Sequence, residues 1–171
     1  TLTLGYTHAF NLSDADMSYQ HVALSVSQSK QWGQLGLMRA RLHTGKIFRS
    51  GDIPFTDYQH FAGNQTRIGT TASYDNNFLM LPYYARSTAD SYLQLHAEHD
   101  SKGFLFNKIP LLVVLQCGFI AGYNRFSTNE RLLYNKFSTG NDIIGGERNR
   151  LFRLDTVRSL SGPAKTVGHG V

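Results

Sequence analysis

Apolar and polar residues alternate with a period of two along most of this 171-residue chain. Successive side chains of a β-strand point to opposite faces, so each such segment predicts a strand with one apolar face. The first ten residues show the pattern: Leu2, Leu4, Tyr6 and Phe10 alternate with Thr1, Thr3, Gly5, Thr7 and Ala9. Further strands are expected at 19–28, from the Trp32-Gly33 turn to His43, and at about 66–84, 91–106, 111–126, 132–143, 149–160 and 165–171.

The segments between these strands are short and rich in Gly, Pro, Asn, Asp and Ser, which predicts hairpin connections. Aromatic residues make up 12% of the chain and charged residues only 17%, a composition that favours strands over helices. Between Gly45 and Gln65 the alternation is lost, and we expect a loop with one short helical turn around Thr56 to His60. The predicted fold class is all-β and antiparallel.

Strand length and inward charge favour a membrane barrel over a soluble sandwich. Strands of soluble proteins are typically about five or six residues long, whereas a tilted strand of about ten residues crosses a bilayer. Arg39 and Arg41 share the inward face of one expected strand, which suits the polar interior of an outer-membrane barrel. Aromatic residues near expected strand ends suggest girdles at the membrane surfaces: Tyr19, Trp32, Phe48, Tyr83, Tyr84, Tyr92, Phe104, Phe106, Phe126 and Tyr134. We therefore expect an antiparallel up-and-down transmembrane β-barrel.

Length, apolar runs, cysteine count and charge limit the classes of protein to which the chain can belong. We expect residues 1–171 to form one β-barrel domain, whole or partial. The longest apolar run, from Ile109 to Ala121, is interrupted by Pro110, so no membrane-spanning helix is expected. The single cysteine, Cys117, excludes an internal disulfide framework. The net charge is +5, but the basic residues are scattered, so we expect outer-membrane lipid or lipopolysaccharide as partners and no nucleic acid.

Three segments carry a family resemblance: Phe78-Leu-Met-Leu-Pro-Tyr-Tyr84, Ser91-Tyr-Leu-Gln-Leu-His-Ala-Glu-His99 and Gly103-Phe-Leu-Phe-Asn-Lys-Ile-Pro-Leu-Leu112. With the Leu151-Phe-Arg-Leu-Asp-Thr-Val-Arg158 segment, they resemble the C-terminal barrel of a family of uncharacterised Bacteroidota outer-membrane proteins, whose longer members carry a carboxypeptidase-regulatory-like domain before the barrel. The resemblance implies a periplasmic turn formed by Asn107, Lys108, Ile109 and Pro110. About nine strands, where a bacterial barrel needs an even number, predict the C-terminal part of a larger barrel.

Few residues are candidates for chemistry. His96 and Glu98 share one face of a strand and His99 points the other way, so we expect no metal site and no cofactor. No segment resembles the Gly-x-Ser-x-Gly motif of hydrolases, and we expect no catalytic activity. The candidate site is a charge network inside the barrel, expected to brace its wall: Arg39, Arg41, Glu98, Arg153 and Asp155.

The expected function is that of a barrel in the outer membrane of a Gram-negative bacterium. Its role would be non-enzymatic, as a structural or accessory component, or in transport or assembly, with other envelope proteins as partners. Two alternatives stay open. One is a soluble β-barrel that binds a small apolar ligand, and the other is an outer-membrane hydrolase.

Overall fold

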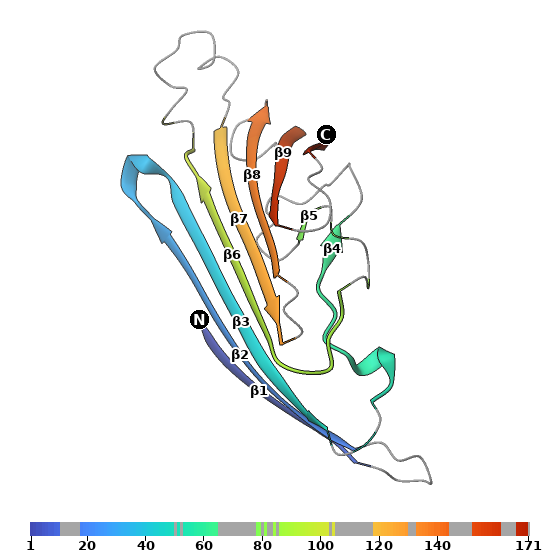
Figure 1. The fold of residues 1–171 in the computed structure, drawn as a ribbon. Helices are drawn as coiled ribbons and strands as arrows, with labels where there is room; N and C mark the ends of the chain where they lie inside the picture. Colours follow the sequence, from blue (N-terminus) through green and yellow to red (C-terminus); the bar gives the residue numbers. More distant parts are fainter. Residues whose placement is uncertain are drawn as a thin grey trace.

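The computed structural model describes residues 1–10, 18–49, 51, 53–64, 78–79, 81, 84, 86–102, 104, 118–129, 133–143, 152–161 and 167–170. Eight strands form one sheet, a single layer of long strands in Figure 1. These are β1 (Leu2–Ala9), β2 (Tyr19–Gln31), β3 (Leu37–Arg49), β6 (Tyr92–Asp100), β7 (Gly118–Thr128), β8 (Leu133–Ile143), β9 (Phe152–Ser161) and β10 (Val167–Gly170). Two-residue strands β4 (Gly63–Asn64) and β5 (Phe78–Leu79) form a parallel pair, and η1 (Gly33–Leu35) and η2 (Phe55–Asp57) are single 3₁₀ turns.

The sheet has a simple up-and-down topology. Its order is β1-β2-β3-β6-β7-β8-β9-β10, and every pair of neighbours is antiparallel. Each strand therefore pairs with the next sheet strand along the chain. The connection between β2 and β3 contains η1, and that between β3 and β6 contains η2, β4 and β5. The all-β, antiparallel prediction is confirmed. In the described residues the sheet is open, with β1 and β10 at its edges, so a closed barrel is not observed.

Strand bounds differ from the prediction in several places. β2 continues to Gln31 instead of ending at 28. β6 ends at Asp100 instead of 106, because the chain turns there, with a positive φ at Lys102 and a hydrogen bond from the Phe104 amide to Ser101 O. β3 continues through Gly45 to Arg49, because cross-strand pairing with β2 persists up to the Tyr19–Arg49 pair after the alternation in the sequence fades. The strand expected over 66–84 is represented among the described residues by β5 alone. The short helical turn expected around Thr56 to His60 is present as η2, which begins one residue earlier and ends three residues earlier.

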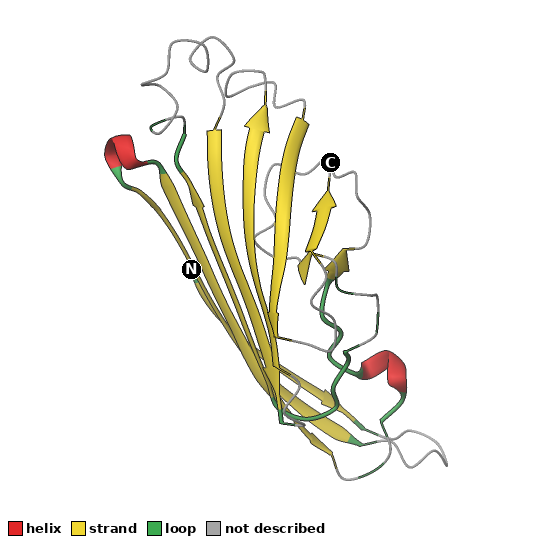
Figure 2. Ribbon diagram, turned by 45° about the horizontal axis from the view of Figure 1, so that its top comes forward, coloured by secondary structure: helices red, strands yellow, loops and turns green. Residues whose placement is uncertain are grey.

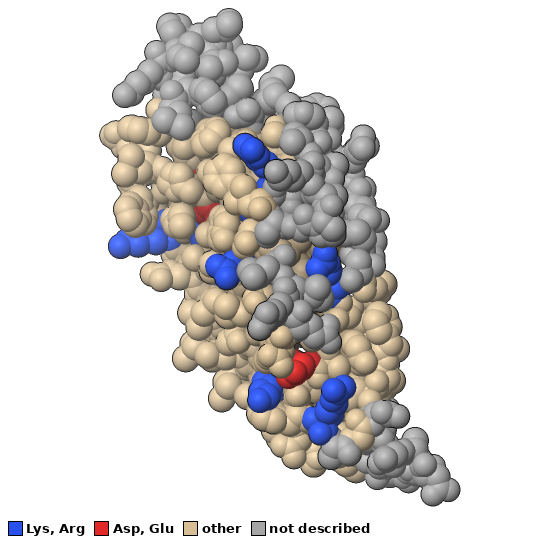
Figure 3. Space-filling view, viewed as in Figure 1, with Lys and Arg blue, Asp and Glu red and all other residues tan. Residues whose placement is uncertain are grey.

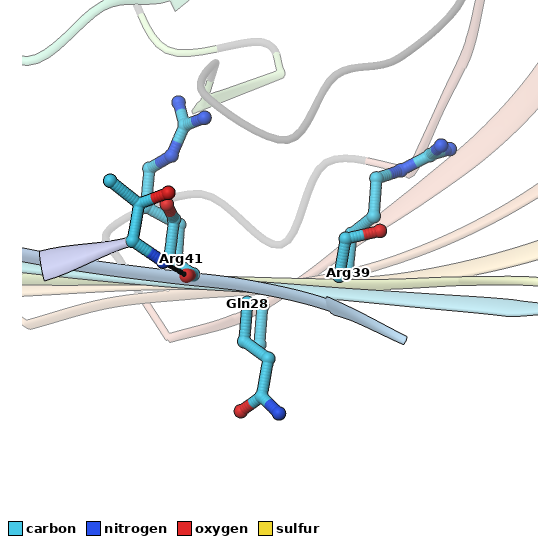
Figure 4. Close-up of a pocket in the computed structure, with 7 residues that line it drawn as sticks. Gln28, Arg39 and Arg41 are labelled. Atoms are coloured by element: carbon cyan, nitrogen blue, oxygen red, sulfur yellow. Dashed lines mark hydrogen bonds between the residues drawn. The ribbon is translucent and has the colours of Figure 1, made fainter. Parts of the chain in front are cut away.

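The two faces of the sheet differ in an unusual way. Along β6 the buried positions are Tyr92, Gln94, His96, Glu98 and Asp100, and the alternate positions are more exposed. This buried face is called the inner face below, and the opposite one the outer face. Figure 4 shows the same division in β2 and β3: Arg39 and Arg41 extend to one side of the sheet and Gln28 to the other.

The outer face carries an apolar band across β1, β2, β3 and β6, and on β7 the next residues in its two rows are Arg125 and Ser127. Leu2, Val26, Leu42 and Leu95 are successive register partners across β1, β2, β3 and β6. The next row contains Leu4, Leu24, Thr44 and Leu93. Leu2 and Leu4 are 71% and 73% exposed. A globular sheet buries its apolar face, so this sheet has its polarity reversed relative to that rule.

The turn between β2 and β3 yields a stability prediction. Gly33 and Gly36 both have positive φ, at 55° and 100°, and only at Gly36 would an added Cβ fall on the backbone of Asp100. A left-handed conformation alone costs an L-residue about 1–2 kcal/mol. We expect Gly33→Ala to cost about that much and Gly36→Ala clearly more, measured as the free energy of unfolding in urea. Equal losses would contradict the close approach of this turn to the end of β6.

Candidate functional site

The inner face is covered at one end by the chain between β3 and β6. This inserted segment, defined by its described residues 53–64, 78–79, 81, 84 and 86–91, leaves the sheet after β3 and returns at β6. Figures 1 and 2 both place it on one side of the sheet, with η2 near the end of β3. Its Phe61, Phe78 and Leu81 form a buried cluster with Tyr92, Phe126 and Tyr134 of the sheet.

The rings of this cluster are arranged in a stack. Phe61 stacks on Phe126 with centroids 4.4 Å apart, and Phe126 stacks on Tyr134 at 5.0 Å. Phe78 packs edge-on against both Phe126 and Tyr134, and it is 0% exposed. Burying one such side chain contributes about 1.5–3 kcal/mol, and favourable ring geometry adds about 0.5–1.5 kcal/mol per pair. The cluster therefore holds the inserted segment firmly on the sheet.

The same cluster corrects one sequence interpretation. Tyr92, Phe126 and Tyr134 were expected in an outward aromatic girdle, and they lie on the inner face instead. The physical reason is that the inserted segment removes these positions from water, so that aromatic side chains are favourable there. Trp32 and Phe48, at strand ends, are exposed as expected.

Polar contacts also hold the inserted segment. Gln59 and Thr88 form an isolated antiparallel bridge with backbone hydrogen bonds of 2.9 and 3.1 Å, which joins the two ends of the segment. The Asn129 side chain, which follows β7, donates a 2.8 Å hydrogen bond to Asp90. This bond fixes the segment's exit to the turn after β7, and it lowers the pKa of Asp90, with the Ser91 amide donating a further bond.

A buried ion pair lies on the inner face beyond the aromatic cluster. Arg39 of β3 donates from Nη2 to Glu98 Oε1 of β6 at 2.7 Å, and the two residues are register partners. Glu98 is only 5% exposed. A carboxylate this deeply buried is stable only when it is paired, so the short bond to Arg39 is what allows an acidic residue at this position.

The other predicted site residues are distributed more widely. Arg41 lies two residues from Arg39 on the same face, opposite His96. Asp155 is buried on β9, three strands from β6 in the sheet order. Arg153 lies in β9, and its side chain is outside the described part. Asn107, Lys108, Ile109 and Pro110, the predicted periplasmic turn, also lie outside the described residues.

The structure brings together inner-face residues that sequence reasoning missed. Tyr92 Oη lies 3.1 Å from His21 Nε2 and 3.2 Å from His43 Nε2, which joins β2, β3 and β6. His96 Nδ1 lies 2.9 Å from Asn124 Oδ1 across β6 and β7. The alternation in the sequence could have shown that these residues lie on the inner face. It could not have shown which of them are in contact, because the strand register decides that.

Two shallow cavities border β2 and β3. The larger, about 410 Å³, is lined by Thr1, Ser27, Gln28, Ser29, Arg39, Ala40 and Arg41 (Figure 4). The smaller, about 300 Å³, is lined by Ser18, Tyr19, Gln20, Phe48 and Arg49. Both linings are largely polar. Figure 3 shows the Lys and Arg side chains of one face at separate positions rather than in one stripe.

The described residues contain no group of three or more His, Cys, Asp and Glu side chains placed to hold a metal ion. His96 and Glu98 share the inner face, whereas His99 is on the outer face. No helix in the described part of the chain is long and apolar enough to cross a membrane.

Comparison with known proteins identifies the family. The chain is an all-β protein built on one up-and-down sheet, and residues 1–140 match the model described as "Family of unknown function (DUF5686) C-terminal domain". The match covers most of the chain, so the protein belongs to this family. No curated protein and no solved structure matches the chain. The resemblance to the C-terminal region of an uncharacterised family is thus confirmed at this level.

The ion pair gives a second prediction. Removing one partner of a buried pair leaves an uncompensated charge, and for a side chain like Arg39, 21% exposed, we expect a loss of about 1–3 kcal/mol. Arg39→Met and Glu98→Gln should each lower the free energy of unfolding, and the double variant should lose less than the sum. Coupling of about 0.5–3 kcal/mol is expected. Lys30→Met, at an exposed position near the end of β2, is the control and should change little. Additive losses would exclude a bracing role.

The Asp90–Asn129 hydrogen bond gives a pH prediction. The pKa of Asp90 is lowered in the folded protein, so its contribution to stability is present above the ordinary Asp pKa of about 3.9 and is lost as the pH falls through the folded value. Wild type should therefore be more stable than Asn129→Ala at pH 7, and the difference should shrink toward pH 3. Urea midpoints at several pH values measure this. A difference that is unchanged at pH 3 would contradict the ionic character of the bond.

Proposed function

We propose that this chain forms the wall of a transmembrane β-barrel in the outer membrane of a Gram-negative bacterium, where it has a non-enzymatic structural, accessory, transport or assembly role. The observation that carries the proposal is the reversed polarity of the sheet. Apolar side chains are exposed on the outer face, and the inner face buries charged and amide side chains, including Glu98 and Asp100. Outer-membrane barrels alternate apolar residues toward lipid and polar residues toward the interior in this way.

The backbone supports the same proposal. β2 and β3 have 13 residues each, and β7 and β8 have 11. A tilted strand of about 9–11 residues is long enough to cross a bilayer. A membrane also requires a hydrogen-bond partner for every backbone polar group, which an up-and-down meander provides for all strands except the two at its edges. We therefore propose that further strands close the sheet, and that this chain is the C-terminal part of a larger barrel.

The soluble alternative is less well supported. A soluble barrel with a small apolar ligand needs an apolar inner face around an empty space. On the described inner face Tyr92, Phe126 and Tyr134 are packed against the inserted segment. Ile47, Ile120 and Val157 are buried outside that cluster, and the other inner-face positions include Arg39, His96 and Glu98. No described observation favours the hydrolase alternative. The absence of catalytic activity stays a prediction.

The proposal includes the finer part of the family resemblance. This part comprises a Bacteroidota origin, a preceding carboxypeptidase-regulatory-like domain and a periplasmic position for Asn107–Pro110. It rests on the sequence resemblance, since the family model describes only a C-terminal domain. Contact with lipopolysaccharide and with other envelope proteins would follow from that location. The scattered Lys and Arg side chains suit lipid phosphates better than a nucleic-acid backbone.

Assembly into the membrane tests the proposal. The full-length protein should be recovered in the outer membrane and should migrate differently on a gel before and after boiling. Leu24→Arg places a charge within the apolar band and should reduce the heat-modifiable form severely, because Arg at mid-membrane on the lipid face costs about 2–4 kcal/mol.

Ser25→Arg is the matched control for this variant. It carries the same charge one residue away on the inner face, next to His43, and assembly should be close to that of wild type. Equal defects in the two variants would overturn the assignment of faces. A wild-type protein that remains soluble without detergent would overturn the membrane proposal itself.

A further inference from the structure

We propose that the inserted segment is a fixed plug, so that the assembled barrel is closed to the passage of ions and small solutes in its resting state. The closure of a passage rests on the proposed function, because it requires a barrel around the segment. The immobility of the segment does not depend on the proposed function, and it can be tested separately.

The first argument is position. The segment leaves the sheet at the end of β3 and re-enters it at Tyr92, so both of its connections lie at the same end of the strands. From there it folds back along the inner face rather than away from it. The centroid of the Phe78 ring is 4.5 Å from that of His96, which is the third inward residue of β6. The plug therefore reaches beyond the strand ends and along the inner face of the sheet.

The second argument is the number of independent attachments. The side chains of Phe61, Phe78 and Leu81 are buried against three strands of the sheet. The described backbone of the segment is itself hydrogen-bonded, since β4 and β5 pair and the Phe78 amide donates to Ala62 O at 2.8 Å. Mobile lids have few buried apolar contacts and exposed backbone hydrogen bonds. This segment has the opposite properties, which identify it as a plug and not as a lid.

The third argument concerns the chemistry of the contact between the plug and the wall. The stack of Phe61, Phe126 and Tyr134, crossed by Phe78, offers an apolar obstruction directly beside a polar face. Apolar constrictions block ions because water is excluded from them. Opening would require the aromatic rings to separate, so passage would depend on a partner that displaces the segment.

Hydrogen exchange tests the immobility of the plug in the full-length wild-type protein. The amides of Phe78 and Leu81 donate backbone hydrogen bonds inside the segment. We expect their protection to lie within about tenfold of that of wall amides in β6 and β7. Exchange about a thousandfold faster than in the wall, near the rate of an open loop, would overturn the proposal whether or not the protein is in a membrane.

Solute entry into proteoliposomes tests the closure. Vesicles that contain the wild-type protein should swell in a small sugar at close to the rate of protein-free vesicles. Phe78→Ala removes the ring at the centre of the cluster, and we expect entry to rise about tenfold or more. Phe137→Ala is the matched control: it removes a Phe from the outer face of β8 and should leave the rate unchanged. If Phe78→Ala fails to assemble, the milder Phe61→Leu takes its place and should raise entry less.

The outcomes separate the two proposals. Heat-modifiable wild-type protein that passes sugar as fast as Phe78→Ala would overturn the plug and leave the membrane proposal intact. Protein that does not enter vesicles at all would overturn the membrane proposal, and hydrogen exchange would still decide whether the segment is fixed. Closed wild-type vesicles, together with an open Phe78→Ala or Phe61→Leu variant, would support both.

Discussion

The structure depends on the constraint that a β-strand sends alternate side chains to opposite faces. When one residue of a strand points outward, the residues before and after it point inward. The strand register then aligns residues of the same orientation on neighbouring strands, so that Leu2, Val26, Leu42 and Leu95 form one apolar row. The polar residues between them are forced onto the inner face. A sheet with this pattern is stable only where the outer environment is apolar and the inner one can satisfy charges.

The inner face meets that requirement in two different ways along its length. Near the ends of β6 and β7 that adjoin the inserted segment, it is apolar, and Tyr92 and Phe126 pack against Phe61 and Phe78. Farther along, it is mostly polar, with Ile120 buried opposite Asp100, and Arg39 pairs with the buried Glu98. The boundary lies at His96, which contacts the Phe78 ring on one side and hydrogen-bonds Asn124 on the other. The inserted segment thus covers the apolar part of the inner face, and the ion pair compensates a buried charge in its polar part.

The sequence alone predicted the parts that depend on local alternation. The faces of Val22, Leu24 and Val26 against Ala23 and Ser25 follow from period two, and the structure agrees. Tyr92, Phe126 and Tyr134 were placed on the wrong face, because the alternation does not reveal what covers a face. The cluster of His21, His43 and Tyr92 could not be found, since its members are separated by up to 71 residues and only register brings them together. Arg39 and Glu98 are 59 residues apart, and their shared parity indicated the face but not the contact.

The central claim is that the outer face contacts lipid and the inner face does not. A cysteine scan across residues 22–27 of β2, in a Cys117→Ser background, tests it most directly, because the inward side chains there are small. Each variant of the full-length protein would carry a fluorophore and be reconstituted in bilayers with brominated lipids. The account predicts strong quenching by lipid at 22, 24 and 26 and weak quenching at 23, 25 and 27. Quenching without this two-residue period, or with the opposite phase, would contradict it.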